Sequence, residues 1–274
     1  MHWLKRAALA AAVSVSALAT NMAFAQAPEP WQIGFQAAAS PVMEQLNSFH
    51  NLLLVIITVI ALFVLGLLLY TISRFSAAKN PTPSRATHNT MLEIAWTVVP
   101  IIILVIIAIP SFRLLYFEDR TVSADMTVKV TGHQWYWSYE YADQGFSFDS
   151  FMIAESDLKP GQKRLLEVDN RLVVPVDSNV RILLNGTDVI HSWYVPAMGV
   201  QTYVTPGRTN ETWFRANKLG VFYGQCNQIC GVNHAFMPIS IEVLSKEQYT
   251  RWLEQAKKQF ASGAQTNLAL AETN

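Results

Sequence analysis

The stretch Cys226-Asn-Gln-Ile-Cys230-Gly-Val-Asn-His234-Ala-Phe-Met237 decides how the rest of the chain is interpreted. It holds the only two cysteines among 274 residues, together with an imidazole and a thioether. These are soft ligands that suit copper, whereas magnesium and calcium prefer oxygen. A second imidazole would complete the set, and His191 is the best upstream candidate. The stretch therefore predicts a copper site.

Glycines at 224 and 231 are natural bending points, so we expect the stretch to be a loop between two strands. The alternative is a disulfide, which two lone cysteines in an exported domain often form if their Cα atoms come within about 7 Å. A disulfide needs neither His234 nor Met237. Either residue alone, or His191 alone, would more often be structural. The ordered combination favours a metal.

The motif resembles the binuclear CuA site of cytochrome c oxidase subunit II, a cupredoxin domain in which two thiolates bridge two copper ions. The resemblance extends over nearly the whole chain, through Gly132-His-Gln-Trp-Tyr-Trp-Ser-Tyr-Glu-Tyr141, Leu165-Leu-Glu-Val-Asp-Asn-Arg171 and Phe236-Met-Pro-Ile239. It implies a two-helix transmembrane hairpin followed by an all-β, cupredoxin-like Greek-key sandwich and a C-terminal helix. It also implies that the chain accepts electrons from cytochrome c and passes them to the haem of subunit I, where oxygen is reduced to water and protons are pumped.

The resemblance assigns the copper ligands. Two thiolates would bridge, each imidazole would bind one copper, and a thioether and a backbone carbonyl would be weaker ligands: Cys226, Cys230, His191, His234, Met237 and the carbonyl of Gln228. The family usually has glutamate where this chain has Gln228. A carbonyl ligand does not depend on the side chain, so the copper site should survive. The family's glutamate, however, also serves a magnesium ion at the contact with subunit I, and a neutral amide is a poorer ligand. We expect the magnesium site to be weakened.

Trp135-Tyr136-Trp137 lies in a predicted strand, where alternate residues face opposite ways. Trp135 and Trp137 would share one face, and Tyr136 would take the other. All three could simply be core aromatics. The resemblance assigns Trp135 to electron entry, as an exposed ring between the donor haem and the copper pair, and it places Tyr136 near the metal.

The formal charge is zero overall, yet residues 133–188 hold nine acids against five bases. Acidic surface is usually solvated, but it can also steer a basic donor by long-range attraction. The resemblance places four of these acids near the donor-docking face: Glu140, Asp143, Asp169 and Asp188.

The first 25 residues are typical of an export signal. Lys5 and Arg6 precede an alanine-rich apolar stretch, and Ala23-Phe-Ala25 is a typical cleavage site, so we expect cleavage before Gln26. The alternative is a membrane anchor, although the apolar core is short for a span. Such a signal implies a bacterial protein whose mature N-terminus lies outside the cytoplasmic membrane.

Residues 26–48 are then expected to be a periplasmic segment before a transmembrane hairpin at 49–117. Two apolar runs, about 49–72 and 91–116, are each long enough to cross about 30 Å of hydrocarbon as a helix. A soluble buried helix pair is the less favoured alternative. The linker 73–90 has no acid and carries Arg74, Lys79, Arg85 and His88, so the positive-inside rule places it in the cytoplasm. The sequence thus predicts a multi-pass protein of the bacterial inner membrane with both termini in the periplasm.

Three residues interrupt the second apolar run. Pro100 and Pro110 predict kinks, and Glu93 lies near the cytoplasmic end, where a carboxylate is either solvated or functional. The resemblance assigns Glu93 to the mouth of a proton pathway that continues through subunit I.

Residues 118–244 alternate short β-rich runs with turn residues, which indicates an antiparallel sandwich carrying the copper site. The expected strands are 126–131, 134–141, 164–168, 179–184, 209–215 and 239–243. Residues 245–274 form the C-terminal helix and tail, with Ser245 and Gln248 as a capping box and disorder expected beyond Ser262.

The partners that the resemblance implies are subunits I and III, cytochrome c and membrane lipid, with no role for nucleic acid. Other classes remain. A quinol oxidase subunit II would lack the copper ligands, and a nitrous oxide reductase would lack the hairpin. A membrane-anchored copper chaperone or thiol oxidoreductase would also use Cys-x3-Cys, but it would have no use for Met237.

Overall fold

The cysteine stretch joins two neighbouring strands of one sheet. The computed structural model describes residues 24–120 and 123–271. In it, β10 (Gly220–Cys226) ends on the first cysteine and β11 (Pro238–Leu244) begins directly after Met237. The two strands are antiparallel and pair from Gly220 opposite Val243 to Gln225 opposite Pro238. The predicted loop between two strands is confirmed.

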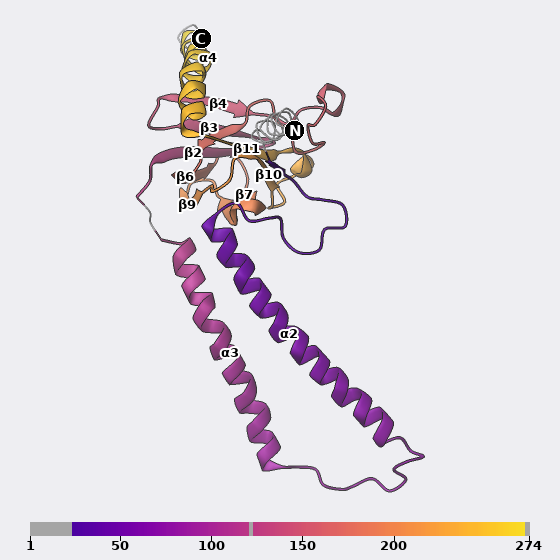
Figure 1. The fold of residues 1–274 in the computed structure, drawn as a ribbon. Coiled ribbons are helices and arrows are strands. Elements are labelled where there is room, and N and C mark those ends of the chain that lie inside the picture. Colours follow the sequence, from indigo (N-terminus) through magenta and orange to yellow (C-terminus); the bar gives the residue numbers. More distant parts are fainter. Residues whose placement is uncertain (1–23, 121–122, 272–274) are drawn as a thin grey trace, which may run out of the picture. The chain divides into compact units, whose positions relative to one another are not determined.

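The β-domain consists of two sheets (Figure 1). One has the order β5-β11-β10-β7-β8, with β1 also paired to β10, and the other has the order β4-β3-β2-β6-β9. The remaining strands are β1 (Phe24–Gln26), β2 (Met126–His133), β3 (Tyr136–Tyr141), β4 (Phe146–Ser150), β5 (Leu172–Pro175), β6 (Asn179–Gly186), β7 (His191–Val195), β8 (Val200–Val204) and β9 (Asn210–Arg215). Three one-turn 3-10 helices interrupt the connections: η1 (Glu155–Asp157), η2 (Pro196–Met198) and η3 (His234–Phe236).

One hydrophobic core lies between the sheets. In β6, alternate residues Val180, Ile182 and Leu184 are fully buried, as expected for a strand with one face in a core. Phe222 and Ile241 of the other sheet belong to the same core cluster. The predicted β-sandwich is therefore confirmed. It is not purely antiparallel, however, because β2 pairs with β6, and β5 with β11, in parallel.

The strand expected at 164–168 is wrong. These residues form a turn with a single isolated bridge, between Val168 and Met152. Leu165 has a φ of 63°, which an extended strand cannot accommodate, and Glu167 turns inward to an arginine. The other expected strands are present with boundaries shifted by a few residues, and β1, β4, β5, β7 and β8 were not among them.

The C-terminal helix α4 (Lys246–Ala271) packs on the β-domain through aromatic rings. Trp252 lies 5.5 Å from Tyr141, and Phe260 lies 4.7 Å from Phe148, measured between ring centroids. The predicted capping box is confirmed, since the backbone N–H of each of Ser245 and Gln248 donates to the side chain of the other. The helix runs on to Ala271, past the point where disorder was expected.

Residues 41–121 form a separate unit, a hairpin of two long helices. Helices α2 (Pro41–Arg74) and α3 (Thr90–Glu118) run in opposite directions and are joined by residues 75–89 (Figure 1). Both are long and apolar enough to cross a membrane. Helix α2 begins eight residues before the apolar run starts at 49, because a proline is well suited to the first position of a helix.

Helix α3 has a defined start. The side chain of Asn89 accepts hydrogen bonds from the backbone N–H groups of Met91 and Leu92, at 3.1 and 3.2 Å. Glu93 Oε1 in turn accepts from the backbone N–H of Asn89 at 3.2 Å. Glu93 therefore has a local structural role as part of the helix cap. Pro100 and Pro110 both lie inside the continuous helix.

Residues 1–23 of the expected export signal lie outside the described residues. Residues Phe24–Gln26 form β1, which pairs in parallel with Gly220–Phe222 of β10. The peptide bond between Ala25 and Gln26, where cleavage is expected, thus falls within β1.

Candidate metal centre

Strand pairing brings the first imidazole to the cysteine loop. His191 is the first residue of β7, and β7 pairs with the end of β10 so that Trp193 lies opposite Cys226. The strands approach closely here, because a Cβ atom on Gly224 would run into the carbonyl oxygen of Tyr194. His191 is completely buried and Cys226 is 6% exposed. A glycine at 224 is therefore a condition for the site.

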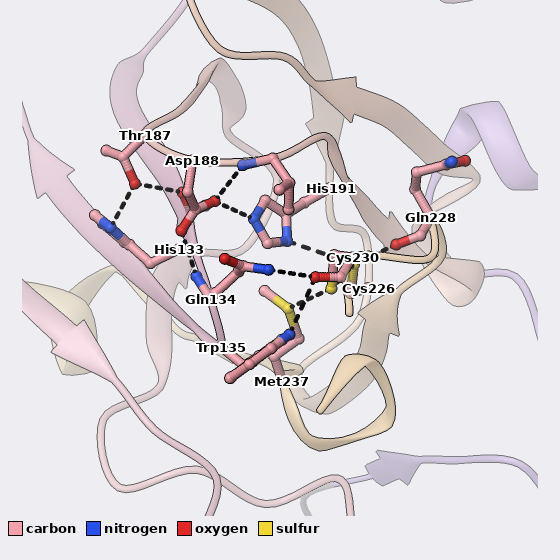
Figure 2. Close-up of polar contacts among 12 residues, drawn as sticks. His133, Gln134, Trp135, Thr187, Asp188, His191, Cys226, Gln228, Cys230 and Met237 are labelled. Atoms are coloured by element: carbon pink, nitrogen blue, oxygen red, sulfur yellow. Dashed lines mark hydrogen bonds and ion pairs between the residues drawn. The ribbon is translucent and has the colours of Figure 1, made fainter. Parts of the chain in front are cut away.

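Cys226 has one imidazole and one carbonyl beside it. Its Sγ lies 3.9 Å from His191 Nδ1 and 3.3 Å from the carbonyl oxygen of Gln228. The amide of the Gln228 side chain points away from the cysteines (Figure 2). This fits the expectation that the backbone, and not the side chain, of Gln228 faces the centre.

Cys230 has its own imidazole and a thioether. Its Sγ lies 3.5 Å from His234 Nδ1 and 3.6 Å from Met237 Sδ. The two cysteines are free, with their Sγ atoms 3.9 Å apart. The structure therefore brings together all six predicted ligands.

The donor set has the chemistry of a copper centre. Each end holds one sulfur, one imidazole nitrogen and one weaker donor, and the ligand atoms of His191, Cys226 and Cys230 all lie within 4.8 Å of one another. Soft sulfur with imidazole selects copper or zinc over magnesium or calcium.

The surroundings shift the pKa values of the two thiols in opposite directions. Burial raises the pKa of Cys226, but hydrogen bonds from His191 and from the backbone of Ser192 and Gln228 outweigh this, so that its pKa is lowered. Burial and the neighbouring charge of Cys226 raise the pKa of Cys230. The surroundings of the two thiols therefore favour ionisation of Cys226 over ionisation of Cys230.

Trp135 lies at the tip of the β2–β3 hairpin and not on a strand, which corrects the prediction. Residues 134 and 135 form the turn between the paired residues His133 and Tyr136. The indole is half-buried and donates from Nε1 to the carbonyl oxygen of Cys230 at 3.2 Å. It also covers Gly231, where a Cβ atom would lie 2.9 Å from the ring. Trp135 thus packs directly on the cysteine loop.

Two neighbours of the centre were missed in the sequence. Gln134 Nε2 donates to the same Cys230 carbonyl at 2.7 Å, and Trp137 Nε1 donates to the carbonyl oxygen of Met237 at 3.2 Å. Trp137 is fully buried, as expected of a core aromatic. The aromatic motif could have pointed to Trp137 as a neighbour of the centre. Nothing in the sequence pointed to Gln134, because its position depends on the hairpin geometry.

Tyr136 stacks between two rings outside the ligand set. Its ring centroid lies 4.4 Å from that of His133 and 4.5 Å from that of Phe151. Burial, with the nearby carboxylates of Asp149 and Asp188, raises its pKa. Tyr136 therefore supports the side of the hairpin, and its place near the metal stays a prediction.

The four predicted docking acids all make hydrogen bonds or ion pairs within the protein. Glu140 pairs with Lys129 at 3.1 Å, and the backbone N–H groups of Thr127 and Phe151 donate to Asp143 and Asp169 at 2.8 Å each. Asp188 Oδ1 lies 2.8 Å from His191 Nε2. Asp188 therefore contacts a predicted metal ligand directly, which the other three do not do in the contacts described.

Comparisons with known proteins agree over most of the chain. The family described as "Cytochrome C oxidase subunit II, periplasmic domain" matches residues 126–244, and "Cytochrome C oxidase subunit II, transmembrane domain" matches residues 28–114. A probable cytochrome c oxidase subunit 2 of Rickettsia bellii is 53% identical over 253 residues, which cover 92% of this chain and 94% of the relative. The subunit 2 of Oenothera berteroana is 50% identical over 85% of this chain and 93% of its own.

A solved structure is similar to about half of the chain. The crystal structure of the periplasmic domain of cytochrome oxidase subunit II of Bradyrhizobium japonicum is 51% identical, with a TM-score of 0.48, and covers 52% of this chain and 99% of its own. The matches to both family regions, and the identity to relatives of nearly the same length, are sufficient for assignment. The chain belongs to the cytochrome c oxidase subunit II family.

Proposed function

We propose that this chain accepts electrons from cytochrome c at a binuclear copper centre and passes them to the haem of subunit I. Membership of the family makes it an electron-transferring oxidoreductase subunit. The observation that carries the proposal is a pair of free, buried cysteines whose Sγ atoms lie 3.9 Å apart, each with its own imidazole. Copper held there supplies a one-electron couple shared by two nuclei.

The residues act by holding a fixed geometry. Cys226 and Cys230 would hold the copper together with His191, His234, Met237 and the carbonyl of Gln228. The exposed fractions of Cys226, Cys230 and Met237 are 6%, 4% and 1%, so water is largely excluded from these ligands. Cys226 ends β10, His191 begins β7 and Met237 directly precedes β11, so paired strands anchor three of the ligands. Such a rigid site suits electron transfer without bond chemistry.

Trp135 is the proposed entry point for the electron. Its indole packs on Gly231 and donates to the Cys230 carbonyl at 3.2 Å, which gives a contact path from the half-exposed ring to a bridging ligand. A donor that docks over this ring needs no access to the buried metal.

Replacing Trp135 by phenylalanine should slow reduction by cytochrome c while the copper content stays unchanged. The smaller ring loses the hydrogen bond to Cys230 and opens a gap. We expect a loss on the order of a hundredfold, the scale on which a misplacement of about 1 Å acts. Stopped-flow reduction measures it, with Trp252→Phe on α4 as a control that keeps the normal rate. An unchanged rate in Trp135→Phe would remove the entry role.

Donor docking is proposed at the acidic face that includes Glu140, Asp143, Asp169 and Asp188. An acidic face attracts a basic cytochrome c, so the association rate should fall as ionic strength rises. A rate that does not depend on salt would contradict this role.

The membrane hairpin carries one further proposal, and the cysteine loop carries another. Glu93, at the cap of α3, would stand at the mouth of a proton pathway in subunit I, and unchanged turnover and proton uptake in Glu93→Gln would refute this.

Gln228 would weaken the magnesium site of the family, because its amide is a poorer ligand than a carboxylate. Stoichiometric, tightly held magnesium in the purified complex would contradict that weakening.

Two helices fit for membrane spans support a membrane-anchored chain. We propose that residues 1–25 are a cleaved signal, that 26–48 are periplasmic, and that the hairpin 49–117 has its linker 73–90 in the cytoplasm. The copper domain 118–244 and the helix and tail 245–274 would then lie in the periplasm of a bacterium, with the spans in the inner membrane against subunits I and III and lipid. A protease added from the periplasmic side should cut the β-domain and spare the linker. The alternative of a chaperone or thiol oxidoreductase is not favoured by the family.

A further inference from the structure

Asp188 lies in the short loop between β6 and β7 with both carboxylate oxygens in use (Figure 2). Oδ1 accepts from His191 Nε2 at 2.8 Å and from the backbone N–H of Val189 at 2.6 Å. Oδ2 accepts from the backbone N–H of Gln134 at 2.7 Å. The side chain is 29% exposed. Its oxygens are thus directed to groups of this protein, and only part of the carboxylate is presented to a donor.

The first of these bonds orients a predicted metal ligand. A neutral imidazole has one N–H and one lone pair, so a hydrogen on Nε2 leaves Nδ1 free as a ligand. In His191, Nε2 faces Asp188 and Nδ1 faces Cys226. The ring is also confined, since Trp137 packs against its face edge-on and Gly132 leaves just enough space beside Cδ2. Asp188 therefore selects the tautomer that a metal at the cysteines requires.

The second bond reaches the hairpin tip that carries Trp135. Gln134 is held to Asp188 through its backbone and to the Cys230 carbonyl through Nε2 at 2.7 Å. Trp135 shares the same carbonyl. One carboxylate thus connects His191, on one side of the centre, to the tip that rests on Cys230, on the other.

The loop that carries Asp188 is itself fixed. The backbone N–H of Thr187 donates to the carbonyl of Gly132 at 3.2 Å, and its Oγ1 lies 2.9 Å from His133 Nδ1 (Figure 2). The carboxylate therefore has a defined place relative to β2, the strand that leads into the hairpin tip.

We propose that Asp188 is a positioning residue of the copper centre, which sets the tautomer of His191 and fastens the Gln134–Trp135 tip to the cysteine loop. The inference rests on the proposed function. It gives Asp188 a second role beside that of a docking charge, and this role acts through His191 and Gln134.

The tautomer can be tested without copper. In the metal-free full chain labelled with nitrogen-15 histidine, and at alkaline pH where imidazole is neutral, His191 should carry its hydrogen on Nε2. Asp188→Ala should mix the two tautomers, whereas Asp188→Asn keeps one acceptor oxygen and should retain the native tautomer. Glu140→Gln, which removes an exposed docking charge, should leave the spectrum unchanged. A native tautomer in Asp188→Ala would overturn the proposal, and this result does not depend on whether copper binds.

Copper affinity provides the second readout. Loss of the carboxylate partner of a ligating histidine typically weakens metal binding about 10–100-fold, and we expect this in Asp188→Ala, with a smaller loss in Asp188→Asn. If Asp188 acts only as a docking charge, both variants and Glu140→Gln will slow the cytochrome c reaction at low salt with unchanged copper affinity. That pattern would refute the positioning role. Failure of the wild-type chain to bind paired copper would instead refute the proposed function.

Discussion

Cys226→Ser is expected to abolish the paired copper centre while leaving the fold in place. A serine hydroxyl is a hard oxygen that does not bridge two copper ions as a thiolate does, and it takes up slightly less space in a site that is 6% exposed. The chain should lose the electron paramagnetic resonance signal of an electron shared by two nuclei, and its reduction by cytochrome c should fall to background. Metal analysis and the resonance spectrum of the full chain in detergent measure both effects.

A buried serine on the neighbouring strand serves as the control for this variant. Ser240 of β11 is 1% exposed and is not among the predicted ligands. Ser240→Ala should keep the copper content and spectrum of the wild type. If Cys226→Ser bound two copper ions with the native spectrum, bridging by Cys226 would be excluded.

Arg171→Met is expected to destabilise the β-domain by about 3–5 kcal/mol, the usual cost of removing one partner of a buried ion pair. The guanidinium donates from Nε and Nη2 to the two oxygens of Glu167, at 2.9 and 2.8 Å, and from Nη1 to Glu242 at 3.3 Å. The Glu167 side chain is fully buried, while that of Arg171 is 26% exposed. Hydrogen bonding to Glu167 raises the pKa of Arg171, so the guanidinium stays charged.

Without Arg171, the buried carboxylate keeps the hydroxyl of Tyr223, at 2.9 Å, as its side-chain donor. Tyr223 lies on β10, three residues before Cys226, so the damage should extend toward the metal centre. Urea unfolding followed by tryptophan fluorescence measures the loss of stability.

The same loop offers a matched control for Arg171. Arg164 Nε donates to Glu155 at 2.7 Å, but the two side chains are 60% and 69% exposed. Exposed pairs contribute between zero and about 1 kcal/mol, so Arg164→Met should change the stability little. Equal losses in the two variants would show that burial of Glu167 is not what makes Arg171 important.

Much of the candidate site could be predicted from the sequence because its ligands are local. Five of the six ligands lie within twelve residues, and glycines on either side predicted the loop that gathers them. The membrane spans were equally clear, since long apolar runs have few other interpretations. His191 was the best upstream candidate for the second imidazole, and it lies beside Cys226 because β7 pairs with β10, a pairing that the spacing alone does not give.

The features that were wrong or missed depend on long-range contacts. Trp135 was placed on a strand because the aromatic run fits one, but it lies in the two-residue turn of the hairpin. Residues 164–168 look β-rich, yet Glu167 turns inward to meet Arg171. Asp188 was interpreted as surface charge, because only the folded chain brings His191 and Gln134 to its two oxygens.

The most direct test of the central claim is the copper content of the full chain, purified in detergent and loaded with copper, together with its electron paramagnetic resonance spectrum. The account predicts two copper ions per chain and a hyperfine pattern from one electron shared by both nuclei. One copper with the pattern of a single nucleus, or no copper and a disulfide between Cys226 and Cys230, would contradict it.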